Sequence, residues 1–239
     1  MVSFNDKGKK MKIKIFYDGT DIKNYTDNDL IAGYTTNISF MKQSGITDYD
    51  KFIKGSLKYS KGKPISFQLY DDDDENIERT AKKITSYDKS IYVKIPVIKT
   101  DSSSNAGIIK KLHEENVKVN VTAIFYKAQI DSLVGCFDKN TPVIISIFAG
   151  RINDCGVDST EIVQYAKQKF AHLDNVEILW AACRTVYNVI EAENQGADIV
   201  TIPAAVVNRI HRLQDDVAEA GLKAAQQFRN DGITGNIKF

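Results

Sequence analysis

The chain has 239 residues, of which 43% are hydrophobic and 26% charged, proportions that are ordinary for a folded globular protein. Its 32 basic and 31 acidic residues leave a formal net charge of +1, which provides no general attraction to nucleic acid or to an anionic membrane. No apolar run approaches the roughly 18 residues of a membrane span, and the basic start of the chain lacks the apolar core of a signal peptide.

Cysteine and histidine are too few and too scattered for two common kinds of site. Cys136, Cys155 and Cys183 have no paired spacing, so we expect neither a disulfide framework nor a cysteine metal cluster. The three histidines are equally dispersed, which argues against a zinc site or a histidine-based triad. We therefore expect a cytoplasmic protein with no metal and no cofactor. Residues 1–10 are expected to form a loose leader before a single domain over 11–239.

Eight short runs rich in β-branched and aromatic residues predict strands, and longer segments of helical period separate them. In chain order the strands are expected at 12–18, 30–36, 64–70, 91–97, 117–125, 142–150, 176–182 and 197–203. The intervening segments place apolar residues three or four apart, as amphipathic helices do, for example at 74–88, 104–116, 159–173 and 185–196.

This alternation predicts an α/β fold made of parallel β-α-β units, because parallel strands need a crossover connection. Eight such units in a chain of this length are typical of a closed (β/α)8 TIM barrel. A doubly wound open sheet is the alternative, but the segment after the first strand, "YDGTDIKN", has a single glycine and no phosphate-binding loop. The C-terminal tail is expected to be helical, to break at Gly232 and Gly235, and to cap the barrel or pack on a neighbouring subunit.

A lysine lies at the centre of the fourth expected strand, "SIYVKIPVI". An unpaired cation in a buried strand costs several kcal/mol, so Lys94 needs an explanation. Either its head group reaches water at the strand end, or the chain uses an amine whose pKa is lowered by burial.

Other polar residues lie within or just after the expected strands, where the active sites of this fold collect. Each has an ordinary explanation when taken alone, as a loop or cap residue, a β-former or an outward-facing side chain. The full set, which all point to one end of a barrel, is Asp18, Thr36, Asn37, Gln68, Lys94, Thr122, Ser146, Arg151 and Arg184.

Together these residues predict carbonyl chemistry on a phosphorylated sugar. An amine in a desolvated pocket is uncharged near neutral pH, attacks a carbonyl and forms a Schiff base. Asp18 can move the proton on the substrate hydroxyl as a neighbouring carbon–carbon bond breaks or forms. Arginines present planar donors to phosphate. The residues therefore indicate an aldolase-type enzyme that acts through Lys94.

Several blocks of the sequence resemble the transaldolase family. "GYTTNIS" is similar to the family's signature near the second strand, and "YVKIPV" resembles its Schiff-base lysine strand. "VNVTAIF", "FAGRIND" and "GADIVTIP" follow in the family's order, so the resemblance runs from about Lys12 to Pro203. It points to the small-subunit branch, which contains both transaldolases and fructose-6-phosphate aldolases.

The resemblance implies a role for each matching position. Lys94 would form the Schiff base, Asp18 would be the general acid/base, and Thr122 and Gln68 would orient the catalytic water. The remaining matches concern the substrate: Thr36, Asn37 and Ser146 near the dihydroxyacetone unit, Phe148 beside it, and Arg151 and Arg184 at the sugar phosphate. The resemblance also implies a homo-oligomer, with phosphorylated sugars as substrates and no nucleic-acid or membrane partner.

Two positions bear on the reaction's outcome. Phe148 matches the transaldolases, whereas the aldolases have Tyr, whose hydroxyl helps to release free dihydroxyacetone; Gln68 is the aldolase-like choice where transaldolases have Glu. We expect a transaldolase, since Phe removes a donor outright whereas Gln can still orient water. A fructose-6-phosphate aldolase and a non-catalytic sugar-phosphate-binding barrel stay open as alternatives, and the only hint of the second is Ala182, which stands where Ser is common.

The acidic run "YDDDDEN", residues 70–76, allows two interpretations. Clustered carboxylates can bind Mg²⁺ or Ca²⁺, but this run lacks the alternating spacing and the glycine of a calcium loop. We expect it to be the solvated N-terminus of a helix, where the helix dipole favours negative charge.

Overall fold

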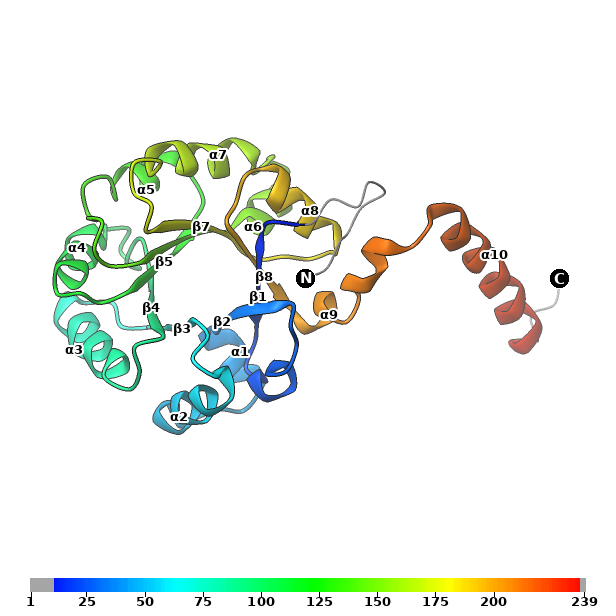
Figure 1. Ribbon diagram of the computed structural model, residues 1–239, viewed down its shortest axis with the longest axis horizontal. Helices are drawn as coiled ribbons and strands as arrows, with labels where there is room; N and C mark the ends of the chain where they lie inside the picture. Colours follow the sequence, from blue (N-terminus) through cyan, green and yellow to red (C-terminus); the bar gives the residue numbers. More distant parts are fainter. Residues whose placement is uncertain (1–10, 237–239) are drawn as a thin grey trace.

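Eight strands alternate with helices along residues 11–236, the part of the chain that this computed structural model describes (Figure 1). The strands are β1 (Lys14–Asp18), β2 (Ile31–Thr35), β3 (Ile65–Gln68), β4 (Ile91–Pro96), β5 (Val119–Ile124), β6 (Val143–Ile147), β7 (Val176–Trp180) and β8 (Ile199–Pro203). The helices are η1 (Ile22–Tyr25), α1 (Ile38–Gln43), α2 (Tyr49–Ser60), α3 (Asp74–Thr85), α4 (Ala106–Glu114), α5 (Lys127–Asp131), α6 (Ala149–Asp154), α7 (Thr160–Lys169), α8 (Tyr187–Asn194), α9 (Ala204–Val207), η2 (Ile210–Gln214) and α10 (Val217–Thr234).

The strands close into a barrel in sequence order. Each strand pairs in parallel with the next, and β8 pairs in parallel with β1. The structure is therefore a (β/α)8 TIM barrel with a C-terminal helix, and all eight expected strands are present. The expected strand at 142–150 is too long, because β6 ends at Ile147 and residues 149–154 form α6. The leader expected over residues 1–10 lies outside the described residues.

Alternation along the strands separates two apolar layers. In β4, Val93 and Ile95 are fully buried and face outward, where they belong to the core between the barrel and its helices. Tyr92 faces inward and packs with Phe16 and neighbouring strand residues inside the barrel. A Cβ added to Gly33 would lie 2.5 Å from the Phe16 ring, so the Phe16 ring occupies this space beside β2. Lys94 follows Tyr92 at the next inward position, nearer the C-terminal end of the strand.

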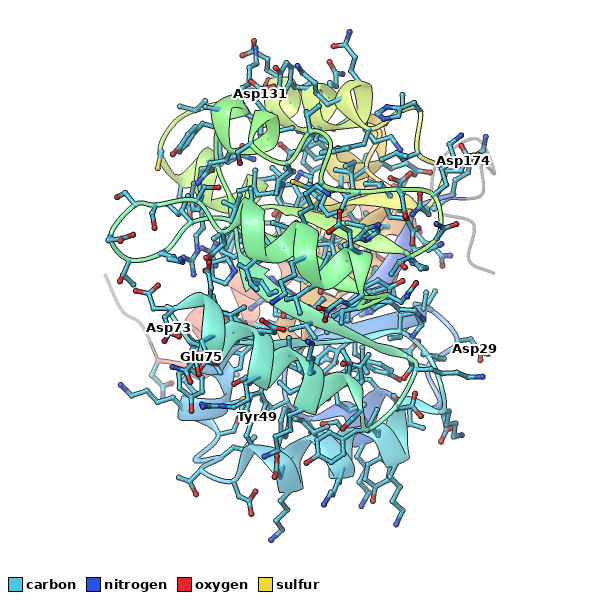
Figure 2. All side chains as sticks on the ribbon, turned by 90° about the vertical axis from the view of Figure 1, so that its left-hand side faces the viewer. Asp29, Tyr49, Asp73, Glu75, Asp131 and Asp174 are labelled. Carbon is cyan, nitrogen blue, oxygen red and sulfur yellow. The ribbon has the colours of Figure 1, made fainter. Side chains whose placement is uncertain are left out.

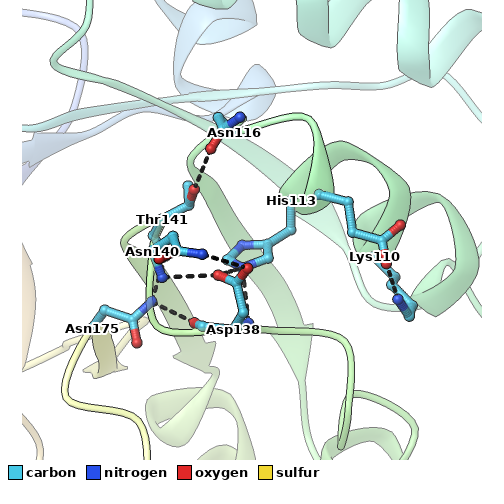
Figure 3. A network of polar contacts seen from close by, with 8 residues as sticks. Lys110, His113, Asn116, Asp138, Asn140, Thr141 and Asn175 are labelled. Carbon is cyan, nitrogen blue, oxygen red and sulfur yellow. Dashed lines mark hydrogen bonds and ion pairs between the residues drawn. The ribbon is translucent and has the colours of Figure 1, made fainter.

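Hydrogen bonds join the loops at the N-terminal end of the barrel (Figure 3). The backbone N–H of Asp138 donates to Nε2 of His113, at 3.0 Å, and the Asp138 carboxylate accepts from Asn140. Asn175, just before β7, donates through Nδ2 to the carbonyls of Asp138 and Thr141 at 2.8 and 2.6 Å. This network connects α4, the segment before β6 and the segment before β7 at the end opposite Lys94.

The acidic run is a helix N-terminus, as expected. The Asp73 side chain accepts a hydrogen bond from the backbone N–H of Asn76, and Asp74 and Glu75 lie in the first turn of α3. Figure 2 shows Asp73 and Glu75 at one end of the barrel and Asp29 and Asp174 at the other. Asp73 and Glu75 follow β3, so their end is the C-terminal end of the strands.

The C-terminal tail projects from the barrel. α10 extends away from it in Figure 1, and no residue of α10 is buried. The tail therefore does not cap the barrel in this structure. The break expected at Gly232 is wrong: α10 continues to Thr234, and Gly235 is the residue that ends it. A glycine inside a helix costs only about 1 kcal/mol relative to alanine, which is too little to end a helix by itself.

Candidate active site

Lys94 is enclosed by the barrel. The residue is 5% exposed, and its Nζ donates to the carbonyl oxygen of Thr36 at 3.4 Å. Burial lowers the pKa of the Lys94 ammonium, attraction to Asp18 opposes this shift, and Arg151 adds to it. The surface explanation for this lysine is therefore wrong, because its head group does not reach bulk water at the strand end.

Asp18 ends β1 on the inner side of the barrel. Its Oδ1 accepts a hydrogen bond from the Thr35 hydroxyl at 2.8 Å. Burial raises the pKa of the Asp18 carboxyl, while Lys94 and the Thr35 hydrogen bond pull it back. The two ionisable groups thus shift in opposite directions, and both approach the range in which a side chain can exchange protons near neutral pH.

A cavity of about 440 Å³ joins these groups at the C-terminal end of the barrel. Nine of the ten residues predicted from the sequence border it: Asp18, Asn37, Gln68, Lys94, Thr122, Ser146, Phe148, Arg151 and Arg184. A hollow of about 600 Å³ lies at the opposite end, where Lys14 pairs with Glu177 and Lys167 with Asp198. The cavity with Lys94 is therefore the candidate site, since active sites of this fold lie at the C-terminal ends of the strands.

Thr36 does not border the cavity. Its side chain is fully buried and its Oγ1 donates to the carbonyl of Ser66 at 2.9 Å, so only its main-chain oxygen faces Lys94. The neighbouring Thr35 takes the place expected for Thr36, because strand residues alternate between the two faces and Thr35 pairs with Asp18 across β1 and β2.

A buried chain of hydrogen bonds crosses the barrel beneath the cavity. The Ser146 hydroxyl donates to Oδ1 of Asn120 at 2.7 Å, and Asn120 Nδ2 donates to the Ser66 hydroxyl at 2.9 Å. Sequence reasoning missed Asn120, although it carries the same signal as Lys94, a polar residue inside an apolar strand. With its own proton given to Asn120, the Ser146 oxygen presents acceptor lone pairs to a ligand.

Thr122 lies at an irregular point of β5. The register with β6 shifts between Val121 and Ile124, and Ala123 has a left-handed φ of 60°. The Thr122 hydroxyl is buried and finds no partner within residues 11–236. A buried hydroxyl without a protein partner is available to a substrate atom or a water molecule. Gln68, paired with Lys94 across β3 and β4, borders the same space.

Asn37 both caps a helix and borders the cavity. Its Oδ1 accepts from the backbone N–H of Phe40 at 2.9 Å, which makes it the N-cap of α1. It also borders the cavity. Capping fixes the direction of the amide through Oδ1 and leaves the Nδ2 hydrogens as donors for a ligand.

Arg151 lies on α6 and Arg184 lies in the loop between β7 and α8, and these two segments are in contact. The guanidinium of Arg151 lies 5.0 Å from the centre of the Phe148 ring, and Arg184 donates to Asp154 at 2.9 Å. The two elements approach so closely that a Cβ on Gly150 would lie 1.9 Å from the carbonyl oxygen of Ala182. This contact places α6 and the β7–α8 loop, and hence both arginines, on one side of the cavity.

Ala182 and Cys183 give the cavity no side-chain hydroxyl or charge: Ala182 borders it with a methyl group, and Cys183 does not border it. Ala182 has a left-handed φ of 64°, an uncommon conformation for a residue other than glycine. Burial raises the pKa of the Cys183 thiol to about 12, and the residue packs in the core. A thiol with that pKa stays protonated near neutral pH and is a poor nucleophile.

The described residues contain no group of three or more His, Cys, Asp or Glu side chains that could hold a metal ion. Within residues 11–236 there is likewise no helix of the length and hydropathy needed to cross a bilayer. The ionisable groups that the cavity assembles are a lysine, a carboxyl and two arginines.

Comparisons with known proteins agree with this geometry. Residues 6–237 match the family model described as transaldolase/fructose-6-phosphate aldolase. A probable transaldolase of Thermoplasma volcanium is 33% identical over 201 residues, which cover 82% of this chain and 86% of the relative. One from Nitrosopumilus maritimus is 30% identical over 222 residues, covering 88% and 92%. Another from Bdellovibrio bacteriovorus is 31% identical over 209 residues, covering 85% and 93%.

The fold has a counterpart among solved structures. A mutant tryptophan synthase alpha-subunit from the hyperthermophile Pyrococcus furiosus superposes with a TM-score of 0.56, covering 85% of this chain and 91% of that one. Its sequence is 12% identical, so this likeness concerns the barrel alone. The family match over nearly the whole sequence is independent of that likeness. The chain belongs to the transaldolase/fructose-6-phosphate aldolase family.

Proposed function

We propose that the chain is a transaldolase, which moves a dihydroxyacetone unit from a ketose phosphate to an aldose phosphate through a Schiff base on Lys94. One observation carries this proposal: a buried lysine amine borders the same cavity as a partly buried carboxyl, at the end of the barrel where two arginines also lie. Burial lowers the pKa of Lys94, which favours the uncharged amine that attacks a carbonyl.

The first half of the reaction breaks a carbon–carbon bond. Nζ of Lys94 attacks the C2 carbonyl of the ketose. Asp18 gives its proton to the carbinolamine oxygen, which leaves as water, and the iminium remains. The bond between C3 and C4 then breaks, its electron pair moves into the iminium, and an enamine forms. Asp18 takes the proton of the C4 hydroxyl as that oxygen becomes the aldehyde of the departing aldose phosphate.

The second half reverses these steps on another aldehyde. The enamine carbon attacks the acceptor aldehyde, and Asp18 returns its proton to the new hydroxyl oxygen. Water then hydrolyses the iminium and frees Lys94. The unpartnered Thr122 hydroxyl and the Gln68 amide, both at the cavity wall, support a role in orienting that water.

The three-carbon unit must stay bound between the two halves. Nδ2 of Asn37 and the oxygen of Ser146 provide a donor and an acceptor for its hydroxyl groups. The Phe148 ring packs between the Phe125 ring, at 5.6 Å, and the Arg151 guanidinium, and it offers no hydroxyl to handle water. These features favour retention of the unit until an aldehyde arrives.

Arg151 and Arg184 would bind the sugar phosphate. The Arg151 guanidinium lies over the Phe148 ring, and its N–H groups lie in the guanidinium plane, where they can donate to a phosphate. The ion pair between Arg184 and Asp154 involves side chains that are each about half exposed, so its net stabilisation is small. A phosphate can therefore compete for Arg184 with little loss.

An aldolase that releases free dihydroxyacetone is the second candidate, and Gln68 is the observation that favours it. An amide at this place cannot act as a general base on water, as a carboxylate could, so the water step differs from that expected with Glu. A barrel that only binds sugar phosphates is the third candidate, supported by the missing hydroxyl at Ala182.

A product assay separates the candidates. The protein is incubated with fructose 6-phosphate, with and without an aldose phosphate acceptor, and both the new ketose phosphate and free dihydroxyacetone are measured. We expect transfer in the presence of acceptor and little dihydroxyacetone in its absence. Dihydroxyacetone released at the rate of substrate loss, without acceptor, would contradict the transaldolase proposal.

A pair of matched variants tests the reason given for retention. Phe148→Tyr adds a hydroxyl to the cavity, and we expect the ratio of dihydroxyacetone release to transfer to rise severalfold. Phe125→Tyr adds the same group to the neighbouring ring, which does not border the cavity, and should leave the ratio unchanged.

We also propose that the chain assembles as a homo-oligomer through α10. Helices in proteins draw most of their stability from packing of an apolar face, and α10 buries no residue of its own against the barrel. Its exposed apolar side chains are Val217, Leu222, Phe228 and Ile233. A second copy of the chain can cover them, since each copy also has a hollow of about 420 Å³ beside the start of α10, bordered by Val186 and Leu213.

A further inference from the structure

Two hydroxyl groups link the last strand of the barrel to Asp18. β1 lies between β2 and β8, and Thr35 pairs with Asp18 across β2 while Thr201 pairs with Phe16 across β8. The Thr35 Oγ1 lies 2.8 Å from Oδ1 of Asp18 and 2.6 Å from Oγ1 of Thr201. Thr35 and Thr201 are 0% and 2% exposed, so bulk water does not reach either residue freely.

The direction of these hydrogen bonds follows from counting protons. An ionised carboxylate only accepts, so Thr35 must give its single hydroxyl proton to Asp18. Thr35 then has none left for Thr201, and the 2.6 Å contact requires the Thr201 hydroxyl to donate to the Thr35 oxygen. Both O–H groups therefore point along one path toward Asp18.

We propose that Thr201 is a positioning residue, which acts through Thr35 to hold the Thr35 proton on the Asp18 carboxylate. A donor to Thr35 polarises its O–H group and strengthens the bond that Thr35 makes to the anion. Bonds to an ionised carboxylate are stronger than those to a neutral carboxyl, so the chain favours the charged form of Asp18. Burial favours the neutral form, and the Thr35 hydrogen bond opposes it.

This balance matters for the reaction, and the inference rests on the proposed function. Asp18 must be ionised when it takes the C4 hydroxyl proton, although the barrel end is poorly solvated. The ionisable groups around it are Lys94 on β4, Tyr17 on β1, Arg151 on α6, and Cys183 and Arg184 after β7. From β2 and β8 it meets Thr35 and Thr201, which do not titrate, so an effect of Thr201 comes from its hydroxyl alone.

The test compares the pH dependence of kcat/KM for transfer in the wild-type protein, Thr201→Val and Thr201→Ser. Valine keeps the shape of threonine without the hydroxyl, and serine keeps the hydroxyl without the methyl group. We expect the acid limb to move up by about half a pH unit in Thr201→Val, which is a loss of about threefold in kcat/KM below the limb. The limb of Thr201→Ser should coincide with that of the wild-type protein.

An acid limb that does not move in Thr201→Val, or that moves equally in Thr201→Ser, would overturn the inference. If Thr201→Val does not fold by circular dichroism, Thr201→Ala takes its place with the same criteria. The proposed function is tested separately by the wild-type protein: absence of both transfer and a trapped Lys94 adduct overturns that proposal. A wild-type protein that transfers normally, with an unmoved limb in the variant, overturns only the role of Thr201.

Discussion

At the scale of single residues, the site depends on two groups whose proton affinities shift in opposite directions. Burial is the largest influence on both Lys94 and Asp18, and each weakens the other's shift through its charge. Two interacting groups titrate as a pair with apparent pKa values that belong to both. The pair carries a single proton over the pH range between those values, which is the state that the proposed reaction starts from.

The pH profile of kcat/KM tests this account. Since burial raises the pKa of Asp18, the acid limb should lie above 3.8, the ordinary carboxyl value. Since burial lowers the pKa of Lys94, the basic limb should lie below 10.5, the ordinary lysine value. Activity therefore rises through the first limb as the pair loses its first proton, and it falls through the second as the pair loses the proton that the carbinolamine oxygen needs to leave as water. Steady-state assays across the stability range of the protein measure both limbs.

A variant identifies the group responsible for the acid limb. Asp18→Asn cannot ionise, so kcat/KM should fall by about 10²-fold or more and lose its acid limb. A wild-type profile whose acid limb stays at the ordinary carboxyl value, or an Asp18→Asn variant that keeps the wild-type limb, would contradict the assignment of Asp18.

The sequence predicted the site residues that interrupt the apolar pattern of a strand or follow its end. It missed those whose role depends on a neighbour from another strand. Lys94 stands out as a charge in an apolar strand, and Asp18 as a carboxylate at a strand end. Thr35 and Thr36 are adjacent and identical, and only the strand register shows which one faces Asp18. Asn120 became meaningful once Ser66 and Ser146, from other strands, were placed beside it.

At the scale of elements, the contact between α6 and the β7–α8 loop places both arginines. Gly150 donates its backbone N–H to Ala181 at 3.1 Å, and its missing side chain leaves room for the Ala182 carbonyl. Each partner carries one arginine, Arg151 on α6 and Arg184 on the loop. Any group inserted at Gly150 must therefore separate the two cations.

We expect Gly150→Ala to damage phosphate binding. The new Cβ would lie 1.9 Å from the Ala182 oxygen, so backbone must move, at a cost of about 1–3 kcal/mol in the free energy of unfolding. KM for a phosphorylated acceptor should rise about tenfold, with a smaller effect on an unphosphorylated aldehyde. Kinetics with both acceptors and denaturant unfolding measure these effects.

Gly107→Ala in α4 is the matched control. A Cβ there meets nothing within 4 Å, so the free energy of unfolding should stay the same or rise by up to about 1 kcal/mol, with KM unchanged. Equal KM values for Gly150→Ala and the wild-type protein would show that the contact does not position the arginines.

Hydrophobic periodicity predicted which elements exist, but not their irregular points. The left-handed residues Ala123 and Ala182 both border the cavity, yet alanine gives no sequence signal for that conformation. The expected strand at 142–150 was too long because Ala149 and Gly150 continue its apolar pattern. In the structure both residues belong to α6, and Gly150 packs closely against the Ala182 carbonyl. Close approaches between distant segments are a property of the folded chain and cannot be read from local pattern.

At the scale of the whole molecule, barrel closure was predictable because it follows from the number and order of the units. Eight parallel strands with helical crossovers close with every strand edge paired, and the structure pairs β8 with β1. The direction of α10 was not predictable. Its composition is compatible with packing on the barrel or on a neighbour, and the structure shows that it projects from the barrel (Figure 1).

Assembly through α10 predicts a mass above that of the monomer. Phe228 is 76% exposed in the single chain, so a partner that covers it gains about 1.5–3 kcal/mol from its burial. We expect Phe228→Asp to reduce the mass measured by size-exclusion chromatography with light scattering. Gln227→Asp introduces the same charge at the neighbouring exposed position and should keep the wild-type mass. A monomeric wild-type protein, or equal masses for the two variants, would contradict assembly through this helix.

The covalent intermediate on Lys94 is the central claim, and borohydride trapping tests it most directly. The protein is incubated with fructose 6-phosphate, reduced with borohydride, digested and analysed by peptide mass spectrometry. We predict a reduced three-carbon adduct on Lys94 and none on Lys99, which lies five residues further along and pairs with Asp74 at the surface. If no adduct is found on Lys94, or if the adduct is found on Lys99 alone, the Schiff-base mechanism on Lys94 is contradicted.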